Sequence, residues 1–409
     1  MFIYNLIIYI ISPYLILRII IEAIKRRSGL GFIKQRLGFS YRKEHHNVIW
    51  LHASSVGETK IAINLYKKLS RNLPNNKFII TTNTSTSASI IPENKNLIHM
   101  YLPIDWFFAT KRFINLINPK MCILIETEIW PNLIKKCKEE NIPVLIVNAR
   151  LSKKTTVRPM FIKEIYKKVL QNISLILCKS ERDKDEYIKL GYTGKNIKVL
   201  GNLKYSEFNE ERSNDQNIID RKYVLAISTH PDEERQIITE WMKINDKKIL
   251  LVIIPRHSER LGDILSDIPL DMLNIAIRSK EERIRKSTQI YIADTYGEVS
   301  NFLEYCEFVF VGGSLVDHGG QNFIEAASFG KTIIVGPYMY NFIEETEEFL
   351  KNNAMIMVKS SPTLKHVFER LIKSKQRREL FGTNAKKILD MKKNIIDDYC
   401  REIQSLIND

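Results

Sequence analysis

Acidic residues follow two apolar runs of this sequence, at the positions where strands are expected to end. The run 47–53 (NVIWLHA) is followed by Glu58, and the run 121–126 (MCILIE) ends on Glu126. A carboxylate at such a position can act as a general base toward a substrate hydroxyl. For Glu58 a structural interpretation stays open, because an acidic residue in the first turn of a helix is stabilised by the helix dipole.

Glu128 lies two residues beyond Glu126, so the two carboxylates would point the same way if the strand continued. Such a pair beside an apolar strand is costly without partners, which favours a functional pair over one solvated at the sheet edge. Arg150 in NARLS and Lys204 in GNLK are candidate cations near later strand ends. An ordinary surface lysine is the alternative for Lys204.

Two glycine pairs lie within residues 308–337, FVFVGGSLVDHGGQNFIEAASFGKTIIVGP. Glycine allows a close approach of the backbone to a ligand, and the first turn of a helix presents free N–H groups to a phosphate. Gly319 and Gly320 precede a helix-like stretch in this way. The spacing matches neither the dinucleotide nor the P-loop fingerprint, so a tight turn without a ligand stays open.

Three further polar motifs follow apolar runs in the second half: STHPDEE (228–234), PRHSER (255–260) and DTYGE (294–298). Arg256 in the second motif can bind a phosphate or a carboxylate through two parallel hydrogen bonds. Each motif is weak alone, and helix capping is an alternative for the first. Their regular placement after successive strands favours one binding site.

Apolar runs alternate with amphipathic stretches in two sets, the pattern of parallel sheets covered by helices. The runs are 47–53, 77–82, 121–126, 143–149, 174–179, 223–229, 248–255, 289–294, 308–313 and 332–337. We predict an α/β fold of two Rossmann-like, doubly wound domains, 28–204 and 223–409, with a linker at 205–222 and a charged helical tail. Ligands bind at the carboxyl ends of strands, so the cleft between the domains is the expected site.

Residues 1–27 form a separate N-terminal segment. Residues 2–17 are apolar and more apolar residues follow, about the length of a bilayer-spanning helix, with interruptions at Pro13 and Arg18. A basic cluster comes next, which favours a cytoplasmic location for the chain that follows. We predict a membrane anchor that spans the bilayer or lies in its interface, with a buried core helix as the alternative.

The composition fits a two-domain globular protein, with 409 residues of which 44% are hydrophobic. The net charge of +15 would suit nucleic acid or an anionic surface. The sequence is rich in Ile, Lys and Asn and carries no RNP, zinc-finger or basic-zipper pattern, so nucleic-acid binding is not expected. Five cysteines without a CxxC motif indicate reduced thiols and no structural zinc site.

The ordered motifs HASSVGE, ETEIWPNL, NARLS, GNLK, STHPDEE, PRHSER, DTYGE and VGGSLVDHGGQNFIEAA closely resemble the Kdo (3-deoxy-D-manno-octulosonic acid) transferases of lipopolysaccharide biosynthesis, which have the GT-B architecture. The resemblance covers nearly the whole chain, and eight motifs in the right order make it specific. It implies a glycosyltransferase that moves Kdo from CMP-Kdo to the lipid A precursor (lipid IVA) at the cytoplasmic face of the inner membrane. It also implies inverting transfer without a metal or a further cofactor.

The resemblance implies roles for individual residues. Glu58 matches the general base that takes the proton of the acceptor hydroxyl, and Glu126 and Lys204 match residues that stabilise the transition state. The CMP-binding segments match Pro255, Arg256, Tyr296, Gly297, Glu298, Asn322, Phe323, Ile324 and Glu325. On this basis the loop of Gly319 and Gly320 and the helix after it would hold the cytidine nucleotide.

Three positions depart from the family's pattern. Ser87 stands where glycine is usual, Asp232 stands where glycine is common, and Tyr296 replaces a usual methionine. None of these departures removes a proposed catalytic group, so they concern donor affinity and the acceptor side rather than the reaction type.

Two other functions compete with this one. A GT-B enzyme that uses a different nucleotide sugar would prefer another nucleotide, such as UDP, over CMP. A membrane-tethered nucleotide-binding scaffold without catalysis would leave the cellular phenotype unchanged in Glu58→Ala. The combination of Glu58, Glu126, Lys204 and Arg256 argues against the scaffold.

Overall fold

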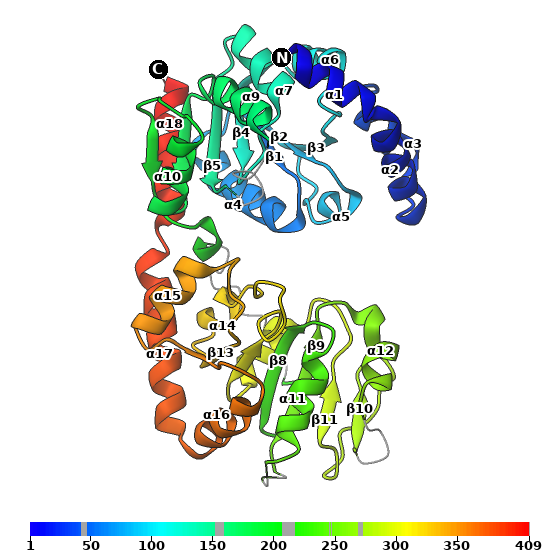
Figure 1. Cartoon of the computed structure of the whole chain (residues 1–409), viewed down its shortest axis with the longest axis vertical. Helices are drawn as coiled ribbons and strands as arrows, with labels where there is room; N and C mark the ends of the chain where they lie inside the picture. Colours follow the sequence, from blue (N-terminus) through cyan, green and yellow to red (C-terminus); the bar gives the residue numbers. More distant parts are fainter. Residues whose placement is uncertain are drawn as a thin grey trace. The chain divides into compact units, whose positions relative to one another are not determined.

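The computed structural model describes residues 1–41, 47–151, 159–206, 217–244, 246, 248–268 and 273–408 (Figure 1). The chain forms two compact units. Unit 1 contains Met1–Glu207 and Asn394–Asp409, and unit 2 contains Phe208–Lys393. Most of the predicted linker, 207–216, lies outside the described residues.

Unit 1 is built on a seven-stranded parallel sheet in the order β3-β2-β1-β4-β5-β6-β7. Its strands are β1 (Val48–Ala53), β2 (Lys77–Thr82), β3 (Leu97–Tyr101), β4 (Pro119–Ile125), β5 (Val144–Ala149), β6 (Leu175–Cys178) and β7 (Ile197–Val199). All residues of β1 and β5 are buried, as expected of central strands covered on both faces. β1 pairs with both β2 and β4, so the direction of chain progression reverses between β1 and β4.

Helices flank this sheet (Figure 1). They are α1 (Phe2–Ile10), α2 (Ser12–Lys25), α3 (Gly29–Arg36), α4 (Val56–Asn72), α5 (Ser85–Ala88), α6 (Phe107–Ile117), α7 (Pro131–Glu139), α9 (Met160–Leu170), α10 (Glu181–Lys189), the 3₁₀ turn η1 (Leu203–Ser206) and α18 (Ile395–Asn408).

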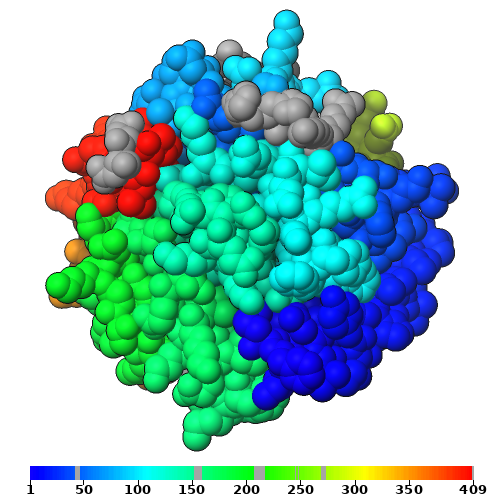
Figure 2. Space-filling model, turned by 90° about the horizontal axis from the view of Figure 1, so that it is seen from above, coloured from blue at the N-terminus to red at the C-terminus, as the bar shows by residue number. Residues whose placement is uncertain are grey.

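The N-terminal segment forms two helices, α1 and α2, bent by 51° at their junction. Trp106 donates to the Ser12 hydroxyl at 2.8 Å, and Tyr4 donates to the Asp105 carboxylate at 2.8 Å, so both helices are tied to unit 1 (Figure 2). Both helices also carry exposed apolar side chains; Phe2, for example, is 81% accessible. No single helix in the described part of the chain is long and apolar enough to cross a bilayer, whereas α1 and α2 together meet that criterion by length and composition.

Unit 2 repeats the architecture with a seven-stranded sheet in the order β10-β11-β9-β8-β12-β13-β14, and every pairing is parallel. Its strands are β8 (Tyr223–Thr229), β9 (Leu250–Pro255), β10 (Ile275–Ile277), β11 (Ile290–Ile292), β12 (Val309–Val311), β13 (Ile333–Val335) and β14 (Met355–Met357). The direction of chain progression reverses between β8 and β12. The two sheets confirm the predicted doubly wound α/β class.

The helices of unit 2 are α11 (Glu233–Trp241), the 3₁₀ turn η2 (Ser258–Arg260), α12 (Leu261–Ser266), α13 (Val299–Tyr305), α14 (Ile324–Ser328), α15 (Ile343–Lys351), α16 (Pro362–Lys373) and α17 (Lys375–Lys392). The expected helical tail is observed as α16, α17 and α18.

The last helix, α18, belongs to unit 1, which differs from the predicted second domain of 223–409. The buried Tyr399 donates to the carbonyl of Gly201 at 2.9 Å, and Lys198 pairs with Glu402 at 2.7 Å. An amphipathic pattern predicts that a helix packs on something, but it does not identify the surface, so sequence position alone assigned this helix to the wrong unit.

Candidate active site

The predicted acidic residues of unit 1 lie where the chain direction reverses, at the carboxyl ends of β1 and β4. Strands diverge at such a point, and the crevice outside them is where ligands bind in open α/β sheets. Glu58 is in the first turn of α4, directly after β1, and Glu126 follows the last residue of β4. The fold therefore brings together two carboxylates that are 68 positions apart in the sequence.

Glu58 takes part in a reciprocal cap of α4. Its backbone N–H donates to the Ser55 hydroxyl at 3.3 Å, and that hydroxyl contacts Glu58 Oε1 at 2.9 Å. Ser54 contacts Glu58 Oε2 through its backbone N–H at 2.7 Å and its Oγ at 2.9 Å. The structural interpretation of Glu58 as a capping residue is therefore correct, and the same contacts hold the carboxylate in a fixed orientation.

The environment of Glu58 raises the pKa of its carboxyl group. Burial is the largest cause, followed by the negative charges of Glu126 and Glu128, while hydrogen bonds from Ser54 and Ser55 oppose the shift. Burial and like charge both disfavour the ionised form. A carboxylate whose pKa is raised in this way is a better match to proton abstraction near neutral pH than an exposed one.

Glu126 lies in a left-handed backbone conformation, with φ of 60°. This conformation is uncommon for a residue with a side chain and tends to occur at functional sites. Its carboxylate lies 3.5 Å from Arg150 Nε and 3.8 Å from Lys204 Nζ. The structure therefore brings Lys204 and Arg150 together around the Glu126 carboxylate.

The position of Lys204 depends on a buried side chain of β5. Asn148 has a φ of 51°, and its Oδ1 accepts the backbone N–H of Leu203 at 2.9 Å. This bond fixes the start of η1 and, with it, the base of Lys204. The motif NARLS therefore serves the site twice, through Asn148 and through Arg150.

Glu128 does not lie parallel to Glu126, because the strand ends at Ile125 and the backbone turns at Glu126. Its carboxylate contacts Ser54 Oγ at 2.7 Å and accepts from Trp130 Nε1 at 2.7 Å. Burial raises the pKa of Glu128, but contacts with His52, Ser54 and Trp130 outweigh it and lower the pKa overall. The two carboxylates were expected to point the same way only if the strand continued, and the strand ends before Glu126.

His52 also belongs to this cluster, although the sequence singled it out only as part of a motif. It is fully buried at the end of β1, with Nε2 3.5 Å from Glu128 and Nδ1 2.9 Å from the Thr81 hydroxyl. A polar residue inside the apolar run NVIWLHA was the available signal, because a buried imidazole needs polar partners.

In unit 2 the first glycine pair is part of an internal anion site. The Glu233 carboxylate accepts the backbone N–H groups of Gly313, Ser314 and Leu315 at 2.6, 2.9 and 2.8 Å, and that of His230 at 2.9 Å. Glu233 is fully buried at the start of α11. Its own carboxylate thus occupies the cluster of N–H donors after β12 that would suit a phosphate.

The second glycine pair is required by loop packing. Gly319 and Gly320 have φ of 83° and 79°. A Cβ on Gly319 would lie 2.4 Å from the ring of Tyr340, and one on Gly320 would lie 2.3 Å from Met339 Sδ. The close approach therefore occurs between two segments of unit 2, and the structure accounts for both glycines without a ligand.

Other residues that were predicted to bind the CMP nucleotide lie at the ends of β9 and β11. Pro255 is the last residue of β9, and Arg256 follows as an exposed residue whose backbone N–H donates to Thr229 O at 3.0 Å. Tyr296 is 72% accessible and donates to Glu259 at 2.9 Å, and Gly297 has a φ of 84°.

Glu298 is held in place by Arg278. Two nitrogens of the Arg278 guanidinium donate to the Glu298 carboxylate at 3.2 and 2.7 Å, and the Thr295 hydroxyl also donates to this carboxylate. These contacts, with Arg278 as the largest cause, lower the pKa of Glu298. Glu298 is therefore an oriented acceptor at the N-terminal end of α13.

The segment 322–325 divides between core and surface. Phe323 and Ile324 are fully buried, and the Phe323 ring packs against Phe349 at a centroid distance of 5.0 Å. Their side chains are therefore not available to a nucleotide. Asn322 accepts the N–H of Ile324 at 3.1 Å, and Glu325 Oε1 accepts from Ser300 at 2.7 Å.

The departures from the family's pattern have local explanations at two positions. Asp232 has a φ of 73°, which accounts for a preference for glycine there, and its side chain accepts from Arg235 Nε at 2.8 Å. Ser87 is buried in α5, where it contacts the Thr84 hydroxyl at 2.9 Å. Tyr296, the third, is exposed as described above.

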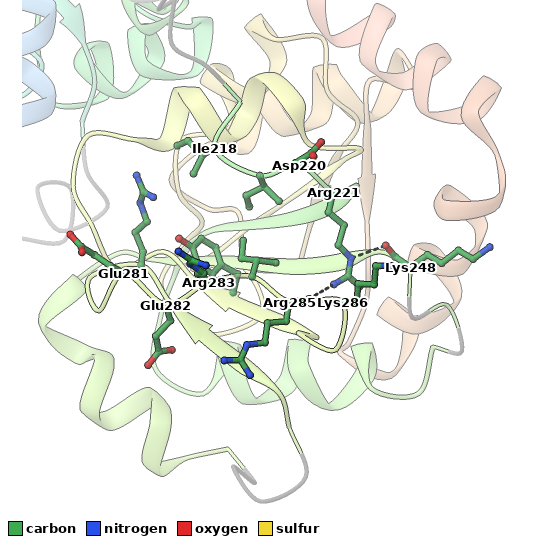
Figure 3. A pocket seen from close by; sticks show the side chains of 13 residues that line it. Ile218, Asp220, Arg221, Lys248, Glu281, Glu282, Arg283, Arg285 and Lys286 are labelled. Atoms are coloured by element: carbon green, nitrogen blue, oxygen red, sulfur yellow. Dashed lines mark hydrogen bonds between the residues drawn. The ribbon is translucent and has the colours of Figure 1, made fainter.

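A cavity of about 930 Å³ lies elsewhere in unit 2 (Figure 3). It is lined mainly by charged residues, including Arg221, Arg278, Arg283 and Lys286. Figure 3 shows Arg221 bound to the carbonyl of Lys248, at 2.9 Å, so this guanidinium fixes the cavity wall. None of the predicted nucleotide-binding residues lines it, but Arg278 links its wall to Glu298.

Within the ranges that the structure describes, no group of three or more His, Cys, Asp or Glu side chains is arranged to hold a metal ion. The five cysteines are free and buried.

Two doubly wound units in one chain define a GT-B glycosyltransferase fold. A glycosyltransferase from Rickettsia africae matches 89% of this chain and 98% of its own, with a TM-score of 0.64 and 12% identity. A UDP-N-acetylglucosamine 2-epimerase matches 89% of this chain and 97% of its own, with a TM-score of 0.60 and 13% identity. At such identities the likeness shows the fold alone.

Sequence comparison identifies the family. The family model described as 3-Deoxy-D-manno-octulosonic-acid transferase (kdotransferase) matches residues 32–207. The 3-deoxy-D-manno-octulosonic acid transferase of Rickettsia bellii is 31% identical over 97% of both chains, and that of Haemophilus influenzae is 33% identical over 83% of both. The chain belongs to the 3-deoxy-D-manno-octulosonic acid transferase family and is a glycosyltransferase.

Proposed function

We propose that this enzyme transfers Kdo from CMP-Kdo to the lipid A precursor, lipid IVA, with inversion at the anomeric carbon and without a metal. The observation that carries the proposal is the carboxylate cluster of unit 1, where Glu58 has a raised pKa and a fixed orientation beside the charged group of Glu126 and Lys204. Family membership supports the donor and the pathway.

Glu58 acts as the general base in this proposal. It takes the proton of the acceptor hydroxyl while the oxygen attacks the anomeric carbon of Kdo and the bond to the CMP phosphate breaks. Base catalysis of this kind contributes about a hundredfold or more to the rate. The contacts with Ser54 and Ser55 keep the carboxylate aimed throughout.

Glu126, Lys204 and Arg150 stabilise the charges that change during transfer. The sugar passes through a state with oxocarbenium character, while negative charge develops on the departing phosphate. A fixed carboxylate suits the former, and fixed cations suit the latter. The Glu126 carboxylate lies 3.5 Å from Arg150 Nε and 3.8 Å from Lys204 Nζ, so the three charges form one group at the end of β4.

In unit 2 we assign the donor nucleotide to the groups at the ends of β9 and β11 and the start of α14. Arg256 would meet the phosphate, and Glu298, Asn322 and Glu325 would accept from the nucleoside. Arg278 and Ser300 orient two of these carboxylates. The loop of Gly319 and Gly320 has a supporting role in this proposal, since both glycines pack closely against Tyr340 and Met339.

The exposed apolar face of α1 and α2 is the proposed contact with the inner membrane, on its cytoplasmic side. Large apolar residues on it include Phe2, Ile10, Tyr14, Leu17 and Ile24. An apolar helix face next to basic residues binds an anionic bilayer surface. Because these helices are tied to unit 1, the membrane contact and the carboxylate cluster lie on the same unit.

The test is transfer of Kdo to tetra-acylated lipid A precursor, with CMP-Kdo generated in the assay and products identified by mass spectrometry. The wild type should give products heavier by whole Kdo units, and Glu58→Gln should lose activity about a hundredfold or more. Glu139→Gln, a surface residue of α7 in the same unit, is the matched control and should behave as the wild type. A fully active Glu58→Gln would exclude Glu58 as the base.

Two further measurements address the remaining elements of the proposal. Activity in excess EDTA should equal activity without it; a loss that Mg²⁺ restores would refute metal independence. Binding of CMP should exceed that of UDP, and the reverse preference would indicate an enzyme for a different nucleotide sugar.

A further inference from the structure

The hydroxyl of Ser54 lies between two carboxylates. Its Oγ is 2.9 Å from Glu58 Oε2 and 2.7 Å from Glu128 Oε1. A serine hydroxyl carries one proton and can donate it to only one of them. The second contact is a hydrogen bond only if that carboxyl group itself carries a proton and donates it to Ser54 Oγ. The geometry therefore places one hydroxyl within hydrogen-bond distance of two carboxyl groups, an arrangement through which a proton can pass from one to the other.

We propose that Ser54 and Glu128 form a proton relay for Glu58. In the relay Glu58 gives its proton to Ser54 Oγ, and the Ser54 hydroxyl gives its own proton to Glu128 Oε1. One O–H bond breaks and one forms at Ser54, so the serine is unchanged, while Glu58 becomes a carboxylate and Glu128 becomes a carboxylic acid. This inference rests on the proposed function, because it gives the general base a way to lose its proton.

The surroundings of Glu128 fit its role as the proton acceptor of the relay. Its other oxygen, Oε2, accepts from Trp130 Nε1 at 2.7 Å and lies 3.5 Å from His52 Nε2. The Trp130 bond stabilises the ionised form of Glu128, which is the form able to take up a proton, and this bond to Oε2 survives when Oε1 is protonated. Glu128 therefore changes its protonation without losing its position.

The relay explains how a carboxyl group with a raised pKa works as a base. The pKa of Glu58 is raised, mainly by burial, and contacts with His52, Ser54 and Trp130 lower that of Glu128, so Glu58 binds a proton more readily than Glu128 does. The titratable groups that face this pair are Glu126, His52 and Arg36, and Arg150 and Lys204 contact Glu126 in turn. An acceptor hydroxyl that meets Glu58 would draw the proton toward Glu128 and then lose its own proton to Glu58.

The first test needs no substrate. Carboxyl titrations of the ¹³C-labelled protein in detergent should show Glu58 titrating in two coupled steps in the wild type. In Glu128→Gln, Glu58 should titrate in a single step at lower pH, since the neighbouring charge is gone. Ser54→Ala should decouple the two carboxyl groups, and Ser54→Thr, which keeps the hydroxyl, should restore the coupling.

The second test is kinetic. Glu128→Gln and Ser54→Ala should lower kcat about tenfold with little change in KM, and Ser54→Thr should recover most of the loss. Glu139→Gln serves again as the control. A titration of Glu58 that is the same in the wild type and Glu128→Gln would overturn the relay, and so would an unchanged kcat.

The two experiments also separate this inference from the proposed function. If the wild type transferred no Kdo, the proposed function would fail, while the titrations would still decide whether Glu58 and Glu128 share a proton. If Kdo were transferred and the titrations were uncoupled, only the relay would fail.

Discussion

The two units place a glutamate at the same topological position and use it differently. In unit 1, Glu58 follows β1 and lies opposite the end of β4; in unit 2, Glu233 follows β8 and lies opposite the end of β12. Burial raises the pKa of both carboxyl groups. Their hydrogen-bond donors differ. The Glu233 carboxylate accepts hydrogen bonds from four backbone N–H groups. The Glu58 carboxylate accepts from one backbone N–H and from two serine hydroxyls.

This difference separates a structural carboxylate, Glu233, from Glu58, the carboxylate that we propose as the base. Backbone N–H groups cannot lose their protons or rotate away, so Glu233 is held as a fixed acceptor that joins the start of α11 to the loop after β12. Hydroxyls can reverse their role from donor to acceptor, so Glu58 can change its protonation state. A raised pKa alone therefore does not distinguish Glu58 from Glu233, whereas the chemical nature of their donors does.

Glu233→Gln gives the largest expected effect on stability. The amide would point a donor at N–H groups that need an acceptor, so unit 2 should lose about 3 kcal/mol. Its melting transition, measured by calorimetry, should fall by about 6–12 °C. Glu58→Gln should change the transition of unit 1 far less. Equal losses in the two variants would refute the distinction between them.

Gly320→Ala should destabilise unit 2 by about 2 kcal/mol, because the residue has a positive φ and its Cβ would collide with Met339. The melting transition again provides the measurement. CMP affinity of the folded variant should stay within about twofold of the wild type, which isothermal titration would show. A selective loss of CMP binding without destabilisation would mean that the loop contacts the nucleotide after all.

Arg278→Gln should weaken CMP binding by about fivefold, since Glu298 would lose the guanidinium that orients it. Arg283→Gln, in the same cavity wall, is the control and should bind CMP normally. If both variants bound CMP as the wild type does, Glu298 would have no role in donor binding.

The smallest expected effect is a shift in the pH dependence of kcat/KM for Kdo transfer. Because protonated Glu58 cannot accept a proton, and its pKa is raised, kcat/KM should rise with pH through that pKa and fall at lower pH. Glu126→Gln removes one of the charges that raise the pKa, so the rising limb should move to lower pH, although the rate at the plateau falls. A limb that stays in place would show that another group controls it.

The sequence predicted the central strands of both sheets but missed four. The missed strands are β3 and β7 in unit 1 and β10 and β14 in unit 2, and each lies at an edge of its sheet. Central strands are covered on both faces and form continuous apolar runs, whereas β7 has the burial of an edge strand, with Lys198 exposed between two half-buried residues. Apolar runs therefore detect the middle of a parallel sheet and not its edges.

The site could be predicted in part from the predicted strands, because residues that directly follow parallel strands meet at one edge of the sheet. Glu58, Glu126 and Lys204 follow strands in motifs, so their meeting follows from the topology of a parallel sheet. His52 and the partners of Glu128 could not be assigned, because they depend on where the chain turns at Glu126. The role of Gly313 could not be assigned either, since a sequence does not show that its N–H faces a glutamate 80 residues away.

The return of α18 to unit 1 has a consequence for the order in which the protein is made. Unit 1 lacks the helix that covers Gly201, next to η1 and Lys204, until the ribosome has synthesised all of unit 2. Unit 2 is continuous and can fold on emergence, whereas the unit with the carboxylate cluster waits for its last part. Removal of residues 394–409 should therefore leave the fold of unit 2 intact. It should impair unit 1, although Glu58 in that unit is far from the removed residues in the sequence.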